Sequence, residues 1–193
     1  MLLKLLLLPF AALALVAAAP PPPAAPPTIP GLIPPPEVVA APANHWFIEL
    51  SNGGKIEVLL RPDLAPNHVA QFQALIRRGF YNGLTFHRVI PGFMAQGGDP
   101  TGTGSGGSDK PNLNAEFNEV SHVRGVCSMA RTPNPNSANS QFFICFDNAN
   151  FLDRQYTVWG EVVSGMEQVD ALPKGEPPRA PGKIVSMKVG ADA

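Results

Sequence analysis

The sequence predicts a mainly β fold with about eight short strands, arranged as a closed antiparallel barrel or a sandwich, and two helices. Three observations predict it. Short segments rich in β-branched and aromatic residues recur along the chain, Gly- and Pro-rich turns separate them, and only two segments have a helical pattern of apolar residues. The 193 residues allow one domain of ordinary size with appendages.

The composition argues against a general nucleic-acid binder, because the formal net charge is -1 and such proteins carry a basic excess. Proline is the unusual residue: there are 23 prolines, and eleven of them lie between Pro20 and Pro42. Without that segment the chain has an ordinary globular composition and is long enough to bury a core.

Residues 1–18 are typical of a secretory signal peptide. Lys4 is the only charge, an apolar run from Leu5 to Val16 follows, and small residues around Ala18 offer a cleavage site. The apolar run is too short for a membrane-spanning helix, which needs about 20 residues. We expect cleavage after Ala18 and export to the periplasm, with an uncleaved N-terminal anchor as the alternative.

Residues 19–43 form a Pro/Ala-rich linker that leads to the folded domain at 44–193. Proline fixes its own φ angle and favours extended geometry in the preceding residue, so we expect a semi-rigid polyproline II spacer. We favour a stalk, because no basic residue flanks the prolines to orient docking. A ligand for a proline-binding partner is the alternative.

The first elements of the domain have clear signals. Two strands are expected at 45–50 and 55–60, joined by a hairpin turn at Asn52-Gly53-Gly54. A helix follows that has Pro66 in its first turn, ends at Gly79 and carries its apolar residues on one face. These apolar residues are Val69, Phe72, Leu75 and Ile76.

The rest of the domain alternates short strands with loops, and a second short helix is expected at 166–172. The further strands are expected at 84–90, 93–97, 125–130, 141–146, 156–162 and 183–189. Alternation along the first of these places Phe86, Arg88 and Ile90 on one face of the strand. An arginine between two apolar neighbours is either functional or a surface residue whose stem covers apolar side chains.

The sequence shows no sign of covalent or metal-based machinery. The four histidines lack metal-ligand spacing and no nucleophile elbow is present, so we expect no metal and no cofactor. Cys127 and Cys145 fall in separate strands, where free buried thiols are favoured over a disulfide. Residues 102–107 match G-x-G-x-x-G, but no helix is expected after them, so we predict a flexible surface loop rather than a nucleotide site.

Three blocks of sequence carry a resemblance to a known family. They lie at 86–99, at 128–131 with 140–144 after a loop, and at 151–156. These blocks resemble the cyclophilin family of peptidyl-prolyl cis-trans isomerases over about residues 46–189. Together with the signal peptide, Phe151 and Tyr156 look most like the bacterial exported branch. The resemblance implies a closed eight-stranded antiparallel barrel capped by two helices.

The resemblance also implies a reaction that needs no nucleophile, metal or cofactor. Amide resonance opposes rotation of a peptide bond by about 18–20 kcal/mol, and X-Pro isomers exchange slowly. A charged donor that reaches the proline nitrogen of the twisted amide binds the transition state better than either ground state. By resemblance Arg88 is that donor, with Phe93 and Gln96 as further catalytic residues, and Gln96 holds the arginine.

The family's substrate-binding positions carry over in the same way. Met94, Phe143 and Leu152, with Phe93, are implied to wall an apolar pocket for the proline ring. The remaining substrate-binding residues are implied to be Gly104, Ala130, Asn134, Gln141, Phe151 and Tyr156. Many family members carry tryptophan in place of Phe151, so binding of cyclosporin-type cyclic peptides is expected to be weakened by the missing indole N–H.

The sequence therefore predicts an exported isomerase that acts on proline-containing unfolded or flexible polypeptides and assists folding in the cell envelope. We expect a monomer. One rival is a proline-binding chaperone whose catalysis is incidental, and another is an envelope interaction module that works through its Pro/Ala-rich arm.

Overall fold

The computed structural model of the chain describes residues 33–192. The expected signal peptide and most of the expected linker lie outside the described residues. Within residues 33–192, no helix has the length and apolar character needed to cross a membrane.

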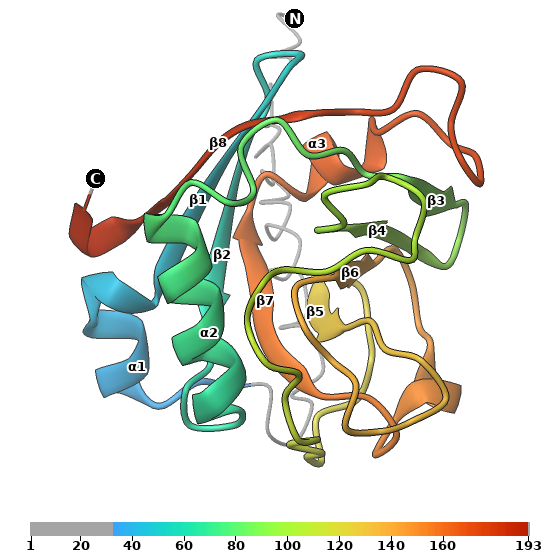
Figure 1. The fold of residues 1–193 in the computed structure, drawn as a ribbon. Helices are drawn as coiled ribbons and strands as arrows, with labels where there is room; N and C mark the ends of the chain where they lie inside the picture. The colour runs from blue at the N-terminus through green and yellow to red at the C-terminus, as the bar shows by residue number, and fades with distance from the viewer. Residues whose placement is uncertain (1–32, 193) are drawn as a thin grey trace, which may run out of the picture.

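Eight antiparallel strands form one strongly curved sheet, which confirms the mainly β prediction (Figure 1). Neighbouring strands follow the order β3-β4-β6-β5-β7-β2-β1-β8. The strands are β1 (His45–Leu50), β2 (Lys55–Leu60), β3 (Arg88–Ile90), β4 (Met94–Gly97), β5 (Val126–Met129), β6 (Phe142–Cys145), β7 (Val158–Ser164) and β8 (Ile184–Val189). Each lies within or close to an expected segment, although β3 covers only the last three residues of the expected 84–90.

The predicted closure of the barrel is overstated. The edge strands β3 and β8 do not pair with each other, and the sheet is a curled half-barrel. A few backbone hydrogen bonds in irregular segments join the two edges: Phe86 N donates to Gly182 O at 2.9 Å, and Ile184 N donates to Leu84 O at 2.8 Å. Residues 84–87 form only one isolated bridge, between Thr85 and Lys183, so no regular ladder of hydrogen bonds closes the barrel.

The short length of β3 also corrects the predicted alternation. Arg88 and Ile90 point to the outer face, but Phe86 is fully buried in the main core together with Val89. Because residues 86 and 87 are not in a regular strand, a period of two does not extend back to Phe86.

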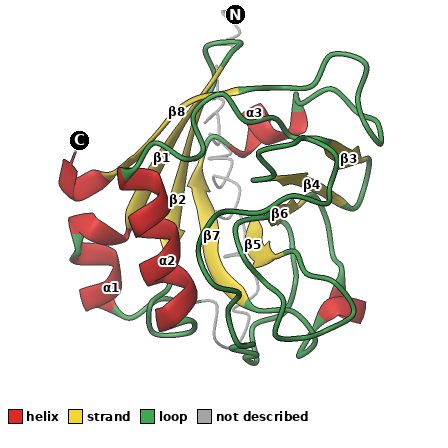
Figure 2. Ribbon diagram, viewed as in Figure 1, coloured by secondary structure: helices red, strands yellow, loops and turns green. Residues whose placement is uncertain are grey.

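Helices cover the openings and one side of the sheet (Figure 2). They are α1 (Pro36–Ala40), α2 (Pro66–Arg77) and α3 (Met166–Asp170), with short 3₁₀ turns at Pro42–Asn44, Asn150–Leu152 and Gly190–Asp192. The two predicted helices are α2 and α3. The predicted apolar face of α2 is buried against the sheet, as are the aromatic rings that surround it.

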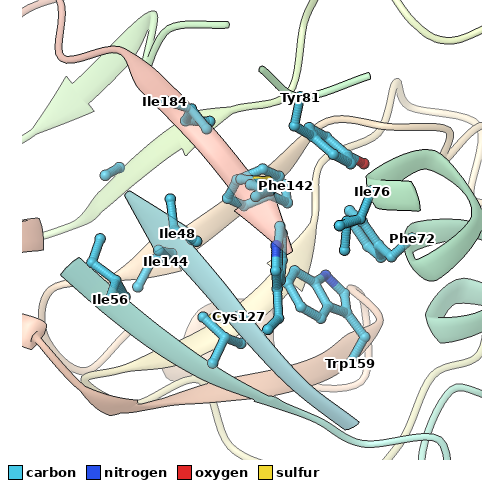
Figure 3. Close-up of a cluster of buried hydrophobic side chains, with 14 of the residues drawn as sticks. Ile48, Ile56, Phe72, Ile76, Tyr81, Cys127, Phe142, Ile144, Trp159 and Ile184 are labelled. Atoms are coloured by element: carbon cyan, nitrogen blue, oxygen red, sulfur yellow. The ribbon is translucent and has the colours of Figure 1, made fainter. Parts of the chain in front are cut away.

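The core between α2 and the sheet is rich in aromatic rings. Trp46, Phe72, Tyr81, Phe142 and Trp159 are each no more than 1% exposed, and Figure 3 labels all of these except Trp46, together with aliphatic neighbours. The ring centroids of Phe72 and Trp159 are 4.4 Å apart. Large rings bury about 150–250 Å² each, so these five contribute strongly to the hydrophobic stabilisation of the domain.

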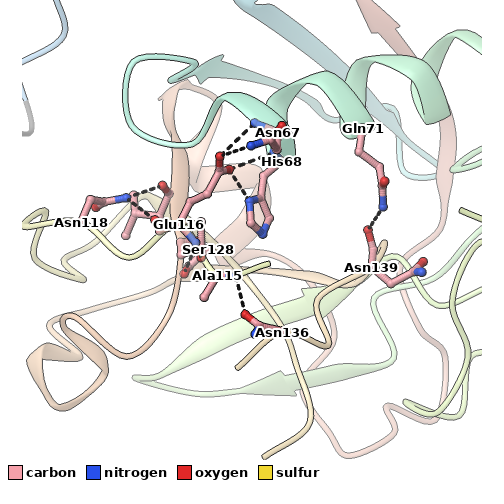
Figure 4. A network of polar contacts seen from close by, with 11 residues as sticks. Asn67, His68, Gln71, Ala115, Glu116, Asn118, Ser128, Asn136 and Asn139 are labelled. Atoms are coloured by element: carbon pink, nitrogen blue, oxygen red, sulfur yellow. Dashed lines mark hydrogen bonds and ion pairs between the residues drawn. The ribbon is translucent and has the colours of Figure 1, made fainter. Parts of the chain in front are cut away.

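A residue far along the chain satisfies the free N–H groups at the start of α2. No side chain at the helix start caps it. Instead the Glu116 carboxylate accepts hydrogen bonds from the backbone N–H groups of Asn67 and His68, each at 3.1 Å (Figure 4). It also lies 2.5 Å from His68 Nδ1. A carboxylate at this end is favoured by the helix dipole, so Glu116 fixes the loop before β5 to the helix.

The last part of the expected linker is folded, which corrects the predicted start of the domain at residue 44. Pro36–Ala40 forms α1, and Val38 is only 6% exposed. Asn44 Nδ2 donates to Val38 O at 3.0 Å, and Gln73 Nε2 of α2 donates to Ala43 O at 2.7 Å. Proline at the first helical position is compatible with a helix, and Val38 supplies apolar area that the Pro/Ala repeat lacks.

The two cysteines are free and buried, as favoured from the sequence. Cys127 faces the main core, whereas Cys145 belongs to a separate apolar cluster with Met94 and Phe143. Cys127 pairs in register with Ile144. Since adjacent residues of a strand point to opposite faces, Cys127 and Cys145 lie on opposite faces of the sheet.

Candidate active site

Register brings Arg88, Gln96 and Phe143 into one row across three strands. Arg88 of β3 is the direct partner of Gln96 of β4, and Gln96 is the direct partner of Phe143 of β6. Direct partners in antiparallel strands project to the same face. Residues 55 positions apart in the chain therefore meet on the outer face of the sheet.

Two adjoining cavities lie over this row. The small cavity has a volume of about 140 Å³ and is lined by Arg88, Met94, Gln96, Ala130, Arg131, Phe143, Leu152 and Tyr156. The large cavity has a volume of about 690 Å³ and includes Gly104, Gln141 and the segments 105–108 and 131–133 in its lining. Gln96, Ala130 and Arg131 line both cavities.

The small cavity has apolar side chains on one side and the polar side chains of Arg88, Gln96 and Arg131 on the other. Met94, Phe143 and Leu152 are buried and form one cluster with Cys145 and Ala149. The ring of Tyr156 meets Phe143 edge to face at 5.9 Å. Arg88 is 40% exposed at its side chain, so its guanidinium is available to a bound molecule.

Gln96 does not hold Arg88, contrary to what the resemblance implied. Its Nε2 donates to Gln141 Oε1 at 2.8 Å, and Gln141 Nε2 in turn donates to Gly104 O at 3.0 Å and Gly106 O at 2.8 Å. The two amides therefore connect β4 to the Gly-rich loop across the border between the cavities. Arg88 Nε instead donates to Glu176 Oε2 at 2.6 Å.

Three predicted site residues do not line either cavity. Phe93 packs on the cluster of Met94, Phe143 and Leu152. Its ring centroid lies 5.5 Å from that of Phe151, which is 67% exposed. Asn134 lies in an exposed turn, where its side chain accepts from Asn136 N and its carbonyl from Ser137 Oγ. The neighbouring residues 132, 133 and 137 line the large cavity in its place.

The Gly-rich segment 102–107 is more ordered than the predicted flexible loop. The buried Asp99 carboxylate accepts hydrogen bonds from the backbone N–H groups of Thr101, Thr103, Gly104 and Gly106, at 2.6 to 3.2 Å. Burial alone would raise the pKa of Asp99, but these hydrogen bonds outweigh it and lower the pKa to about 2. As expected, no helix follows this segment.

Two residues of the site, Arg131 and Glu176, were not predicted from the sequence. The guanidinium carbon of Arg131 lies 4.4 Å from the centroid of the Tyr156 ring, and Arg131 lines both cavities. Arg131 does belong to one of the blocks that resemble cyclophilins, and that membership could have marked it as a site residue. Glu176 lies in a proline-rich loop with no motif, 88 positions from Arg88.

Comparison with known proteins identifies the family. The sequence profile described as "Cyclophilin type peptidyl-prolyl cis-trans isomerase/CLD" matches residues 47–189. The chain belongs to the cyclophilin family. It is therefore a peptidyl-prolyl cis-trans isomerase, an enzyme that catalyses rotation about the bond before proline.

Individual cyclophilins are similar to this chain in sequence. A probable peptidyl-prolyl cis-trans isomerase of Brucella suis is 50% identical over 169 residues, which are 79% of this chain and 86% of that protein. Peptidyl-prolyl cis-trans isomerase B of Bacillus subtilis is 44% identical over 131 residues, 67% of this chain and 91% of that protein.

Solved structures of cyclophilins have the same fold. A cyclophilin from Hirschia baltica matches with a TM-score of 0.73 and 33% identity, covering 79% of this chain and 76% of that one. A cyclophilin-type isomerase from Cryptosporidium parvum, solved in the presence of the dipeptide Ala-Pro, matches with a TM-score of 0.70 and 30% identity, covering 75% of this chain and 98% of that one.

Proposed function

We propose that Arg88 is the transition-state donor of this cyclophilin and that the small cavity receives the proline ring of the substrate. The observation that carries the proposal is the shared cavity: a partly exposed guanidinium borders a pocket whose apolar side includes Met94, Phe143 and Leu152. A proline ring is apolar and compact, so it suits the apolar side of this pocket. The proline nitrogen accepts a hydrogen bond only when the amide twists, and the guanidinium is the donor beside it.

The chemistry follows from the loss of amide resonance. In the planar amide the proline nitrogen shares its lone pair with the carbonyl, and in the twisted amide it regains that pair and accepts a hydrogen bond. An arginine N–H aimed at the nitrogen stabilises the twisted state more than either planar state. Arginine suits this role because it stays protonated and its donors are held in one plane.

The large cavity is proposed to hold the residues that precede proline. Its lining includes the backbone of Gly104 and the side chains of Ala130 and Gln141, and polar groups are spread along it. An extended peptide offers backbone N–H and C=O groups, which such a surface satisfies without selecting one side chain. This supports a broad range of proline-containing client segments.

Replacement of Arg88 by lysine tests the donor role. Isomerisation of a peptide that contains Ala-Pro is measured by NMR exchange with the wild type and with Arg88→Lys. Lysine keeps the charge and loses the planar arrangement of donors, so we expect the exchange rate to fall about tenfold or more. Equal rates would show that a positive charge is enough and that the assigned geometry is wrong.

We further propose that residues 1–18 direct export and that the enzyme acts on unfolded or flexible chains in the cell envelope as a monomer. The proposal rests on the apolar run 5–16 after a single charge and the small residues near Ala18. Cell fractionation followed by mass spectrometry of the recovered protein tests it. We expect a periplasmic protein that begins at Ala19; an intact Met1 in the cytoplasm would overturn the proposal.

A further inference from the structure

Arg88 is fixed by one hydrogen bond in the part of the chain that the structure describes. Its Nε donates to Glu176 Oε2 at 2.6 Å, and no other bond of its side chain is present among residues 33–192. Nε lies at the inner edge of the guanidinium, so the two terminal amino groups remain available for a substrate.

The fold places Glu176 opposite Arg88 through the backbone. In the loop between α3 and β8, Gly175 N donates to Val89 O at 2.9 Å, and Val89 N donates to Gly175 O at 2.8 Å. This is an isolated antiparallel bridge. In an antiparallel pair, the residue before one member faces the residue after the other. Arg88 and Glu176 are therefore cross-strand neighbours.

A second contact holds the same loop at its other side. Lys174 Nζ donates to Asp170 O at 2.5 Å and lies 4.4 Å from the centroid of the Phe146 ring. Lys174 therefore attaches the loop, just before Gly175, to the end of α3 and to the residue that follows β6. In Figure 1 it runs beside β3 on its way to β8.

We propose that Glu176 is a positioning residue for catalysis, because its carboxylate restricts the Arg88 side chain to the orientation that serves the small cavity. An arginine on the surface has many rotamers, and ordering them costs free energy at the moment of reaction. A carboxylate that accepts a hydrogen bond from Nε selects some of these rotamers before the substrate binds. The inference rests on the proposed donor role of Arg88.

The size of the effect is limited by exposure. The side chains of Arg88 and Glu176 are 40% and 51% exposed, and exposed ion pairs of this kind contribute little. We therefore expect Glu176→Ala to lower kcat by about two- to fivefold and to leave KM unchanged, since Arg88 acts on the twisted amide. Glu176→Gln keeps an oxygen that accepts from Nε and is expected to retain most of the activity.

The chain offers a matched control. Arg77 Nε donates to Asp192 Oδ2 at 2.7 Å, with exposures of 45% and 47%, and neither residue lines a cavity of the site. Asp192→Ala removes a comparable pair and is expected to leave kcat and KM unchanged. A general effect of losing a surface ion pair would appear in both alanine variants.

The experiment measures kcat and KM of the full chain and its variants, with the Nε–H resonance of Arg88 in 15N-edited NMR spectra as a direct readout. We expect that resonance to shift in Glu176→Ala and to stay close to the wild-type position in Glu176→Gln. Wild-type kcat in Glu176→Ala, or an equal loss in Asp192→Ala, would overturn the inference. If Arg88→Ala itself keeps full activity, then the donor role of Arg88 is wrong.

Discussion

Phe151 is an exposed side chain at which we expect a single substitution to change ligand binding without disturbing the fold. It is 67% exposed, and its ring centroid lies 5.5 Å from that of Phe93. A phenyl ring offers no hydrogen-bond donor, whereas the indole of tryptophan offers one. We therefore predict that Phe151→Trp increases affinity for cyclosporin by about two- to tenfold, the worth of one hydrogen bond.

Titration calorimetry of wild type and Phe151→Trp with cyclosporin measures this change. Phe117 is a second exposed phenylalanine, at 43%, and unlike Phe151 it has no ring contact with Phe93 beside the small cavity. Phe117→Trp is the control and should bind cyclosporin as the wild type does. Equal affinities for all three proteins would contradict the prediction for Phe151.

Single residues were predictable where a contiguous motif carried them. Arg88, Met94, Gln96, Ala130 and Phe143 lie in the blocks that resemble cyclophilins, and the structure gathers them at the cavities. Glu176 was not predictable, because it meets Arg88 through a bridge between distant segments. The expected partner of Arg88 was Gln96, whose amide bonds Gln141 instead.

The Gly-rich loop is held by the Asp99 carboxylate together with the Gln141 amide, and the carboxylate makes its stability dependent on pH. The ordinary pKa of an aspartate is 3.8, and that of Asp99 is lowered to about 2. A lowered pKa means that the unfolded state binds the proton more readily, so stability is lost as pH falls from about 4 to about 2. The loss attributable to Asp99 is expected to be about 2 kcal/mol.

Urea unfolding of wild type and Asp99→Asn between pH 2 and pH 6 isolates this contribution. Above pH 4 the wild type should be the more stable protein, and the difference should shrink toward pH 2 as Asp99 becomes protonated. A difference in unfolding free energy that is constant over this range would show that the charge of Asp99 does not hold the loop.

Helix α1 attaches the end of the Pro/Ala-rich segment to the domain through Val38. Its side chain is 6% exposed, whereas that of the neighbouring Val39 is 43% exposed. Val38→Ala is expected to lower the unfolding free energy by about 1–2 kcal/mol, from lost apolar area and a small cavity. Val39→Ala is the matched control and should change it by less than about 0.5 kcal/mol.

Thermal or urea unfolding of the full chain measures both variants. Equal effects of the two substitutions would mean that α1 does not pack on the domain as described. Catalytic activity should be unchanged in both, since neither residue lines the site.

Elements with a strong local pattern were predicted well, and those that depend on distant contacts were not. The apolar face of α2, its start at Pro66 and the turn at Asn52-Gly53-Gly54 follow from spacing and turn chemistry. Helix α1 was missed because it begins at the end of a Pro/Ala-rich segment, and its backbone is held by distant side chains, those of Asn44 and His45. The order of the Gly-rich loop depends on Asp99, whose role no local pattern indicates.

At the scale of the whole molecule, the strand count and the antiparallel arrangement were predictable, and the closure of the sheet was not. Closure depends on whether the two edge strands meet in register. Here β3 is only three residues long, and the segments between the edges form isolated bonds around Gly182. The same open arrangement lets the loop after α3 reach β3 and present Glu176 to Arg88.

The curvature of the sheet separates the functions of its two faces. The inner face buries the aromatic core against α2, while the outer face of β3, β4 and β6 carries the cavities. A substitution on the outer row can therefore alter activity without unfolding the domain. Arg88 meets this condition because it is partly exposed and contributes nothing to the main core.

The most direct test of the donor role is the slow refolding phase of a client protein that is limited by proline isomerisation. Wild type should accelerate this phase, and Arg88→Ala should lose acceleration by about 100-fold or more, the size of effect seen when one preorganised donor is removed. The variant should keep the wild-type circular dichroism spectrum and melting temperature. Equal acceleration by a folded Arg88→Ala enzyme would contradict the account.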